Sequence, residues 1–313
     1  MDSKYAYIVA ACTKYIPELT ALLNSLDYVG NKFDVHVIGL NQDRKKEGLP
    51  EMFISQFDKL SYRAIHHPIS SKEIEESRGI SEVTCRKRYW YAADIGKVYD
   101  AVCILDADLI FVRNPWQFFE IAHKTGFILG PCKEQNKVYD DEHHKVNGEW
   151  IIPKGFWNDK DLCNCPVFID TNVWGSALKR SWDIFINDGY KAPDMDAMNM
   201  CFIEAGAHDK IIKLPGLQWL GTNEQHLKPY IRVVVRRDNK LWTENGIELF
   251  SYHGQYYKEK WRKCQLDNRH RCAASYLKTN LDNQASGAMN VLYTYFKKML
   301  DYKITIPHID YVK

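Results

Sequence analysis

The chain of 313 residues is 45% hydrophobic and carries a formal net charge of +2. This composition suffices for a substantial core. A charge so near zero selects neither a nucleic-acid partner nor a neutral one, because binding depends on where charges gather. The sequence has no apolar run of about 20 residues that could cross a bilayer, and its start, MDSKYAYIVAACTKY, lacks the design of a signal peptide. We therefore expect a cytoplasmic protein without a membrane span.

The nine cysteines indicate a reduced protein. They are odd in number and lie mostly inside apolar runs, which does not suit a disulfide framework. A zinc site is not predicted, because the cysteines and histidines that would form it lack the paired Cys-x-x-Cys spacing of structural sites. The residues considered for it are Cys132, Cys163, Cys165, His143 and His144.

Strand-like and helix-like segments alternate through the first half of the chain, which predicts a mostly parallel sheet covered by helices. We expect strands over residues 5–11, 34–40, 61–66 and 99–105. Helices are expected over residues 17–26 and 81–93, with Pro17 in the first turn, where its missing N–H costs little. The strand at 99–105 is expected to be strongly buried.

The second half begins with a short helix after Pro115 and a strand over 126–130. The stretch 131–162 is polar and irregular, and a loop of that length in a compact domain is typically functional. Further strands are expected over 167–170, near 211, and over 230–235 and 249–253, and helices over 172–186, 194–205, 273–281 and 289–300. We therefore expect one domain over 1–262, with an insertion at about 131–162, and a helical extension over 263–313.

Two carboxylates, Asp106 and Asp108, directly follow the apolar strand at 99–105. In open α/β sheets, ligands bind beyond the carboxyl ends of the strands. Carboxylate oxygens suit Mg²⁺ or Mn²⁺, which keep positions open for substrate phosphates. His253 ends a later apolar segment, and a neutral imidazole can complete such a site, especially for Mn²⁺. An Asp-x-Asp also occurs by chance in surface turns, so these residues alone leave the metal site as a hypothesis.

Several short segments in a fixed order carry a family resemblance. They are Tyr7–Thr13 with Tyr15, Cys85–Trp90, Tyr99–Phe111, Asn164–Ile169, Asp194–Asn199 and Tyr252–Trp261. Together they resemble the glycogenin-like and lipopolysaccharide galactosyltransferase family, retaining glycosyltransferases of the family-8 type, over about residues 5–261. The sequence departs from the family pattern at Cys165 and Pro166, where small residues are usual, and at Met195, where glutamine is usual.

The resemblance implies a fold, a set of ligands and a set of roles. The fold is α/β of the GT-A (Rossmann-like) type, with a mixed, mostly parallel sheet flanked by helices and a C-terminal helical tail. The resemblance implies nucleotide-sugar contacts at Ala11, Thr13, Tyr15, Arg88, Asp106, Ala107, Asp108, Lys258 and Lys260. It implies a Mn²⁺ (or Mg²⁺) site at Asp106, Asp108 and His253, and catalytic roles for Asp194, Asp196 and Asn164.

The sequence thus predicts a metal-dependent retaining glycosyltransferase that moves a sugar from a nucleotide-sugar, with a UDP-sugar expected, to a glycan, protein or other hydroxyl acceptor. A homo-oligomer is compatible with it. One alternative is a nucleic-acid base acceptor, because basic residues gather around Trp261. Another is a non-catalytic nucleotide-sugar-binding module, given the departures at Met195, Cys165 and Pro166. A nucleotidyltransferase is less consistent, because the residues after the first strand, Ala11–Lys14, are not a glycine-rich phosphate loop.

Overall fold

The structure is a computed structural model of the whole chain. It describes residues 3–43, 45–131, 145–146, 149–150, 165–189, 194–214, 233–235, 241–243, 248–253, 295–296 and 298–307. Of the predicted insertion at 131–162, the described residues beyond Pro131 form a short antiparallel pair of strands, β7 and β8. No described helix has the length and apolar character that a membrane crossing requires.

A seven-stranded mixed sheet forms the centre of the molecule, in the order β10-β6-β9-β4-β1-β2-β3. Strands β4, β1, β2 and β3 are parallel, whereas β9 runs antiparallel to both β4 and β6. The strands are β1 (Tyr5–Cys12), β2 (Asp34–Leu40), β3 (Ala64–Pro68), β4 (Ala101–Leu105), β5 (Leu109–Phe111), β6 (Ile128–Gly130), β7 (Lys145–Val146), β8 (Glu149–Trp150), β9 (Val167–Ile169), β10 (Ile211–Lys213), β11 (Val233–Val235), β12 (Leu241–Thr243) and β13 (Ser251–His253). The predicted fold class is confirmed.

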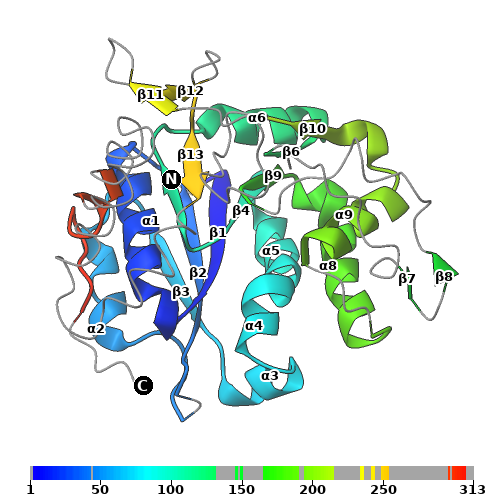
Figure 1. Cartoon of the computed structure of the whole chain (residues 1–313), viewed down its shortest axis with the longest axis horizontal. Helices are drawn as coiled ribbons and strands as arrows, with labels where there is room; N and C mark the ends of the chain where they lie inside the picture. The colour runs from blue at the N-terminus through cyan, green and yellow to red at the C-terminus, as the bar shows by residue number, and fades with distance from the viewer. Residues whose placement is uncertain are drawn as a thin grey trace, which may run out of the picture.

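Helices lie on both sides of this sheet, with α1 and α2 on one side and α5 and α8 on the other (Figure 1). The α-helices are α1 (Ile16–Tyr28), α2 (Glu51–Ile54), α3 (Ser71–Glu76), α4 (Ile80–Glu82), α5 (Arg88–Ile95), α6 (Trp116–Thr125), α8 (Thr171–Ile186) and α9 (Asp194–Glu204). Short 3₁₀ turns are η1 (Thr13–Tyr15), η2 (Phe57–Lys59), η4 (Gly96–Val98) and η6 (His208–Lys210), and a π-helical turn, η3 (Val83–Lys87), joins α4 to α5.

Local sequence explains most of these elements. All of β2 and all but the first residue of β1 are buried, as expected of parallel strands covered on both faces. The third strand was predicted at 61–66 but begins at Ala64, and the first two residues of the predicted range bond to α1 instead. The backbone N–H of Ser61 donates to Asp27 (2.5 Å), and the hydroxyl of Tyr62 donates to the Leu23 carbonyl (2.8 Å).

The described part of the predicted C-terminal extension packs against α1, and the buried side chain of Asn24 makes four hydrogen bonds to its backbone. Its amide nitrogen donates to the carbonyls of Met299 (2.7 Å) and Ile304 (2.8 Å). Its oxygen accepts from the backbone N–H groups of Lys303 (3.1 Å) and Ile304 (3.0 Å). Because Ile304 also lies in the main hydrophobic core, this segment is part of the folded domain.

Replacing Asn24 with alanine is expected to lower the free energy of unfolding by about 3 kcal/mol, because four buried backbone groups lose their partner. Urea unfolding followed by tryptophan fluorescence measures the loss. Asn187→Ala is the matched control, since Asn187 is exposed at the end of α8, and we expect it to change stability by less than about 0.5 kcal/mol. An equal loss in both variants would contradict the anchoring role of Asn24.

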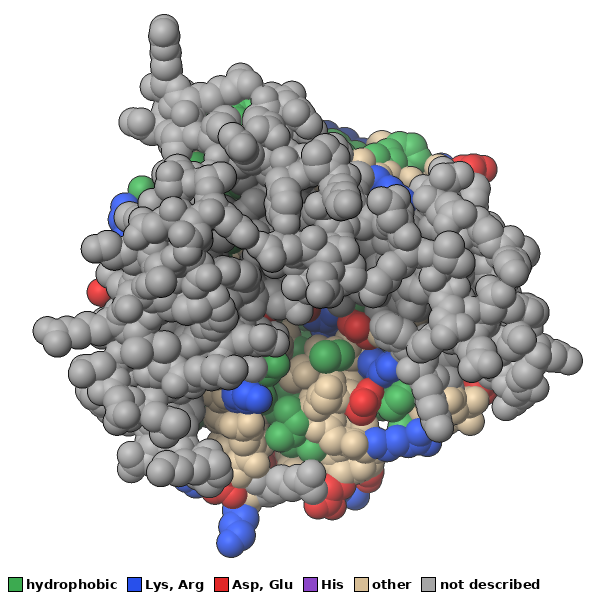
Figure 2. All heavy atoms as spheres, viewed as in Figure 1, with side chains coloured by type: hydrophobic (Ala, Val, Ile, Leu, Met, Phe, Trp, Pro, Cys, Tyr) green, Lys and Arg blue, Asp and Glu red, His purple; other side chains and the backbone are tan. Residues whose placement is uncertain are grey.

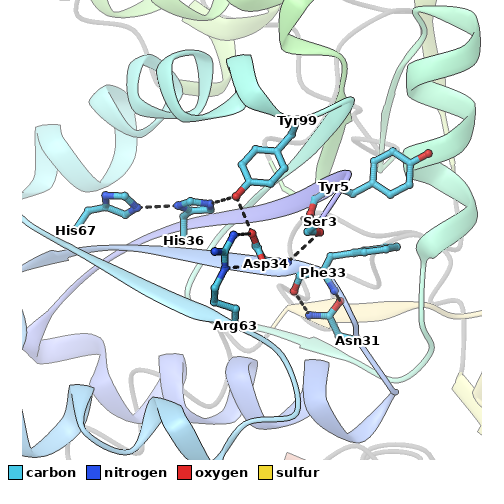
Figure 3. Close-up of polar contacts among 9 residues, drawn as sticks. All are labelled: Ser3, Tyr5, Asn31, Phe33, Asp34, His36, Arg63, His67 and Tyr99. Atoms are coloured by element: carbon cyan, nitrogen blue, oxygen red, sulfur yellow. Dashed lines mark hydrogen bonds and ion pairs between the residues drawn. The ribbon is translucent and has the colours of Figure 1, made fainter. Parts of the chain in front are cut away.

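A continuous hydrogen-bonded chain of polar side chains crosses β2 and β3 near the start of β4 (Figure 3). The carboxylate of Asp34 accepts from Arg63 and from the hydroxyl of Tyr99 (2.8 Å). His36 Nε2 lies 2.7 Å from the same hydroxyl, and His36 Nδ1 lies 2.7 Å from His67 Nε2. Since Tyr99 gives its only proton to Asp34, His36 Nε2 must donate to Tyr99 and His67 Nε2 must donate to His36. While Asp34 is ionised and both imidazoles are neutral, every hydrogen bond in this series therefore has its donor on the side away from Asp34.

Candidate functional site

The Asp-x-Asp motif lies in a tight turn at the carboxyl end of β4. The backbone N–H of Leu109 donates to the Asp106 carbonyl (3.3 Å), which closes the turn between β4 and β5. Asp108 is 5% exposed and Ala107 is also buried, whereas the side chain of Asp106 is 20% exposed. The turn thus holds two carboxylates at the edge of the sheet where ligands bind in α/β folds.

A buried arginine joins this turn to a distant helix. Arg88, the first residue of α5, is 4% exposed at its side chain and forms ion pairs with Asp106 and with Asp194 (3.0 Å), the first residue of α9. Its Nη2 also donates to the hydroxyl of Tyr89 (3.1 Å), which in turn donates to Asp194 (3.4 Å). Three segments that are far apart in the sequence therefore meet around one guanidinium.

The electrostatics of this cluster keep Arg88 charged. Burial alone disfavours the guanidinium, but the adjacent carboxylates, Asp106 foremost, raise the pKa of Arg88 well above its ordinary value. Burial raises the pKa of Tyr89, so its hydroxyl stays protonated and able to donate to Asp194. Two carboxylates balance the charge of Arg88 in this structure, and Arg88 thereby fixes Asp106 and Asp194 relative to each other.

The end of β1 lies at the same edge of the sheet as the Asp-x-Asp turn. Val9 pairs with Leu105, so Ala11, near the end of β1, and Thr13, just after it, lie on the side of the sheet where Asp106 follows β4. The hydroxyl of Thr13 accepts from the backbone N–H of Gln42 (3.1 Å), which links the ends of β1 and β2. Tyr15 is partly buried and packs against the core. The three residues predicted to bind the nucleoside thus lie at the end of the strand next to β4 or in the turn that follows it.

A long-range strand pair brings the second of the two predicted metal-ligand segments to the first. Strand β13 pairs antiparallel with β5, and His253 is the residue opposite Leu109. The backbone of His253 therefore lies beside the residue that directly follows Asp108. The side chain of His253 lies outside the described residues. Among the described side chains there is no group of three or more His, Cys, Asp or Glu residues that could hold a metal ion.

Two solved structures of the galactosyltransferase LgtC have the same arrangement of elements. LgtC in complex with donor and acceptor sugar analogs matches with a TM-score of 0.53 and 15% identity, over 97% of this chain and 98% of LgtC. An active-site mutant of LgtC matches with a TM-score of 0.52 at the same identity and coverage. This chain has the GT-A fold.

More distant comparisons add little to that result. Mouse xyloside xylosyltransferase 1 has a TM-score of 0.48 at 13% identity, over 81% of this chain and 98% of its own. No family model and no curated protein matches the sequence. At 15% identity the likeness to LgtC establishes the fold, and the activity has to be argued from the site.

Within the GT-A fold, the remaining predicted site residues lie at or beyond the limits of the described chain. Asn164, Lys258 and Lys260 lie outside the described residues, as does the side chain of Asp196. Strand β9 pairs antiparallel with β4, with Val167 opposite Ile104. The residues just before Val167 therefore lie at the edge of the sheet that carries Asp106. Asn164 directly precedes these residues in the sequence.

Tyr89 is the residue of this cluster that the sequence did not single out. Its hydroxyl lies between Arg88 and Asp194, and the residue is 1% exposed. The sequence signal that could have found it is its place directly after Arg88 in a helix, with a polar end that needs partners once it is buried. Aromatic residues are common in helices of this kind, so that signal is weak.

Proposed function

We propose that this protein is a metal-dependent glycosyltransferase that takes a sugar from a nucleotide-sugar, with a UDP-sugar as donor, and transfers it with retention at the anomeric carbon. The observation that carries the proposal is the meeting of Arg88, Asp106 and Asp194 at the carboxyl edge of a GT-A sheet. The crystallised complex of LgtC with donor and acceptor sugar analogs supports a sugar-transfer role for this fold.

The proposed metal ligands are Asp106, Asp108 and His253. The first two fit a divalent cation because they are hard oxygen donors held in one turn. The turn leads into β5, which pairs with the backbone of His253. When bound, Mn²⁺ or Mg²⁺ supplies positive charge that stabilises the departing nucleoside diphosphate. Asn164, Lys258 and Lys260 remain proposed contacts of the donor.

Arg88 would act on the same developing charge from the protein side. Breaking the anomeric C–O bond leaves negative charge on the diphosphate, and a guanidinium beside it would help to stabilise that charge. Asp194 is positioned by Arg88 and Tyr89 and is the described carboxylate available to act at the sugar. Ala11, Thr13 and Tyr15 would hold the nucleoside, and Asp196 would share the role of Asp194.

The test is release of nucleoside diphosphate from a panel of sugar nucleotides, with and without Mn²⁺. We expect slow hydrolysis of one donor class in the absence of acceptor, dependent on the cation. Tight cation-dependent binding of the nucleotide without any turnover would favour a binding module instead. Absence of both binding and turnover across the panel would overturn the proposal.

A further inference from the structure

The direction in which Arg88 enters the site depends on an unusual turn of helix. Arg88 directly follows the π-helical turn η3, which interrupts the path from α4 to α5. A π turn contains one residue more than an α turn and recurs at functional sites, because it redirects the side chains that follow it. The turn costs regular hydrogen bonding, so contacts from outside the helix must stabilise it.

Lys87, the last residue of the π turn, makes those contacts. Its ammonium lies 2.9 Å from a carboxylate oxygen of Glu73 and 3.1 Å from the hydroxyl of Ser77, both on or next to α3. The same ammonium lies 5.6 Å from the ring centre of Tyr91 in α5 and 5.5 Å from that of Trp182 in α8. One side chain therefore ties the turn to three helices.

The surroundings of Lys87 suit a fixed ammonium. Its side chain is 14% exposed, and burial of this extent is tolerated because an opposite charge, a hydroxyl and two aromatic faces surround it. Tyr91 also hydrogen-bonds to the Glu73 oxygen that Lys87 contacts, which fixes the carboxylate. On the face of the molecule drawn in Figure 2, basic and acidic side chains of the described residues lie side by side below the centre of the view.

We propose that Lys87 is a positioning residue for Arg88, holding the π turn against α3 and α8 so that the guanidinium reaches Asp106 and Asp194. Lys87 and Arg88 are consecutive, so their side chains leave the helix in different directions, Lys87 toward Glu73 and Arg88 toward Asp106. The inference rests on the proposed function, in which Arg88 binds the diphosphate of the donor.

The test measures binding of UDP in the presence of Mn²⁺ by calorimetry. Lys87→Met is expected to raise the Kd for UDP about tenfold, and Lys87→Arg to restore most of the affinity. Glu73→Gln, which removes the opposing charge but keeps the shape, is a second variant and is expected to act in the same direction. Lys179→Met is the matched control. Lys179 also links α8 to α5, since its ammonium lies 3.4 Å from a carboxylate oxygen of Asp94 and 4.8 Å from the ring centre of Trp90. Neither of these residues belongs to the π turn. We expect this control variant to bind UDP as the parent does.

A double-mutant cycle separates positioning from general destabilisation. In an Arg88→Met background, Lys87→Met is expected to have no further effect on the Kd, because the group that it positions is absent. An unchanged Kd in Lys87→Met and Glu73→Gln, or a full tenfold effect that persists without Arg88, would overturn this inference alone. Failure of the parent chain to bind UDP with Mn²⁺ would overturn the proposed function and this inference with it.

Discussion

Replacing Asp108 with asparagine is expected to lower metal-dependent release of nucleoside diphosphate by about 100- to 1000-fold, the usual loss when one group that stabilises transition-state charge is removed. Asp108 is 5% exposed in the turn that ends β4, so the asparagine fits the same space and only the charge changes. Steady-state kinetics at several Mn²⁺ concentrations give the loss and the apparent affinity for the cation.

The matched control is Asp100→Asn, which changes the same residue type at the other end of the same strand. Asp100 directly precedes β4, and its side chain is 39% exposed. We expect its activity and cation dependence to equal those of the parent chain. A chelator should abolish activity in both, and added Mn²⁺ should restore it in Asp100→Asn but not in Asp108→Asn. Full activity of Asp108→Asn would remove this carboxylate from the proposed metal site.

Elements that depend on local sequence were predictable. The strand predicted at 34–40 is β2, and the helix predicted at 172–186 is α8, which begins one residue earlier. Asp170 caps that helix by accepting from the backbone N–H of Asn172 (2.9 Å), a signal contained in a few neighbouring residues. Apolar periodicity and caps are local properties, so a single sequence carries them.

The turn that aims Arg88 was not predictable. The segment 81–93 was predicted as one helix, but the structure contains α4, the π turn η3 and α5. The π turn is held by Glu73 and Trp182, which lie far from it in the sequence. No spacing within the segment marks the inserted residue, so the direction of Arg88 follows only from the packed structure.

Pairing between distant strands was likewise hidden. A strand ending at His253 was predicted, but its partner, β5, was not predicted as a strand, and neither the partner nor the register could be derived from residues 249–253. The structure places His253 opposite Leu109. The chemistry of a neutral imidazole suggested that His253 could join Asp106 and Asp108. The family resemblance strengthened that prediction because it carries information about the fold that one sequence lacks.

Lowering the pH from 7 to 4 is expected to destabilise the fold by at least about 3 kcal/mol, because the histidines of β2 and β3 are held neutral. Burial, followed by the neighbouring His67, lowers the pKa of His36 from 6.5 to about 4, and burial lowers the pKa of His66 to about 4. The unfolded chain takes up these protons near pH 6.5 and the folded chain only near pH 4. The stability that the neutral histidines contribute is therefore fully present above pH 6.5 and is lost as the pH falls to 4. For His36 alone, the difference in pKa between the unfolded and folded states corresponds to roughly 3 kcal/mol.

The hydrogen bonds explain why the folded state resists these protons. A proton on His36 Nδ1 would face the N–H of His67, so two donors would oppose each other until His67 changed its tautomer. A proton on His66 would remove the lone pair that accepts from the backbone N–H of Leu49 (3.1 Å). Burial raises the pKa of Asp34, but the hydrogen bonds from Arg63 and Tyr99 outweigh it and lower the pKa below 3.8, so its share of the stability is lost only at still lower pH.

Urea unfolding at pH 7, 6, 5 and 4 measures this dependence, and His36→Gln isolates the contribution of one imidazole. Glutamine can still accept from His67 and donate to Tyr99 but does not titrate, so the loss between pH 6.5 and 4 is expected to shrink by roughly 3 kcal/mol. His123→Gln is the control, because His123 lies on α6 with its side chain 41% exposed, and the parent's full pH dependence should persist there. Equal slopes in the parent and in His36→Gln would mean that the hydrogen-bonded chain accepts its proton without cost, and the acid sensitivity would then have to come from the carboxylates.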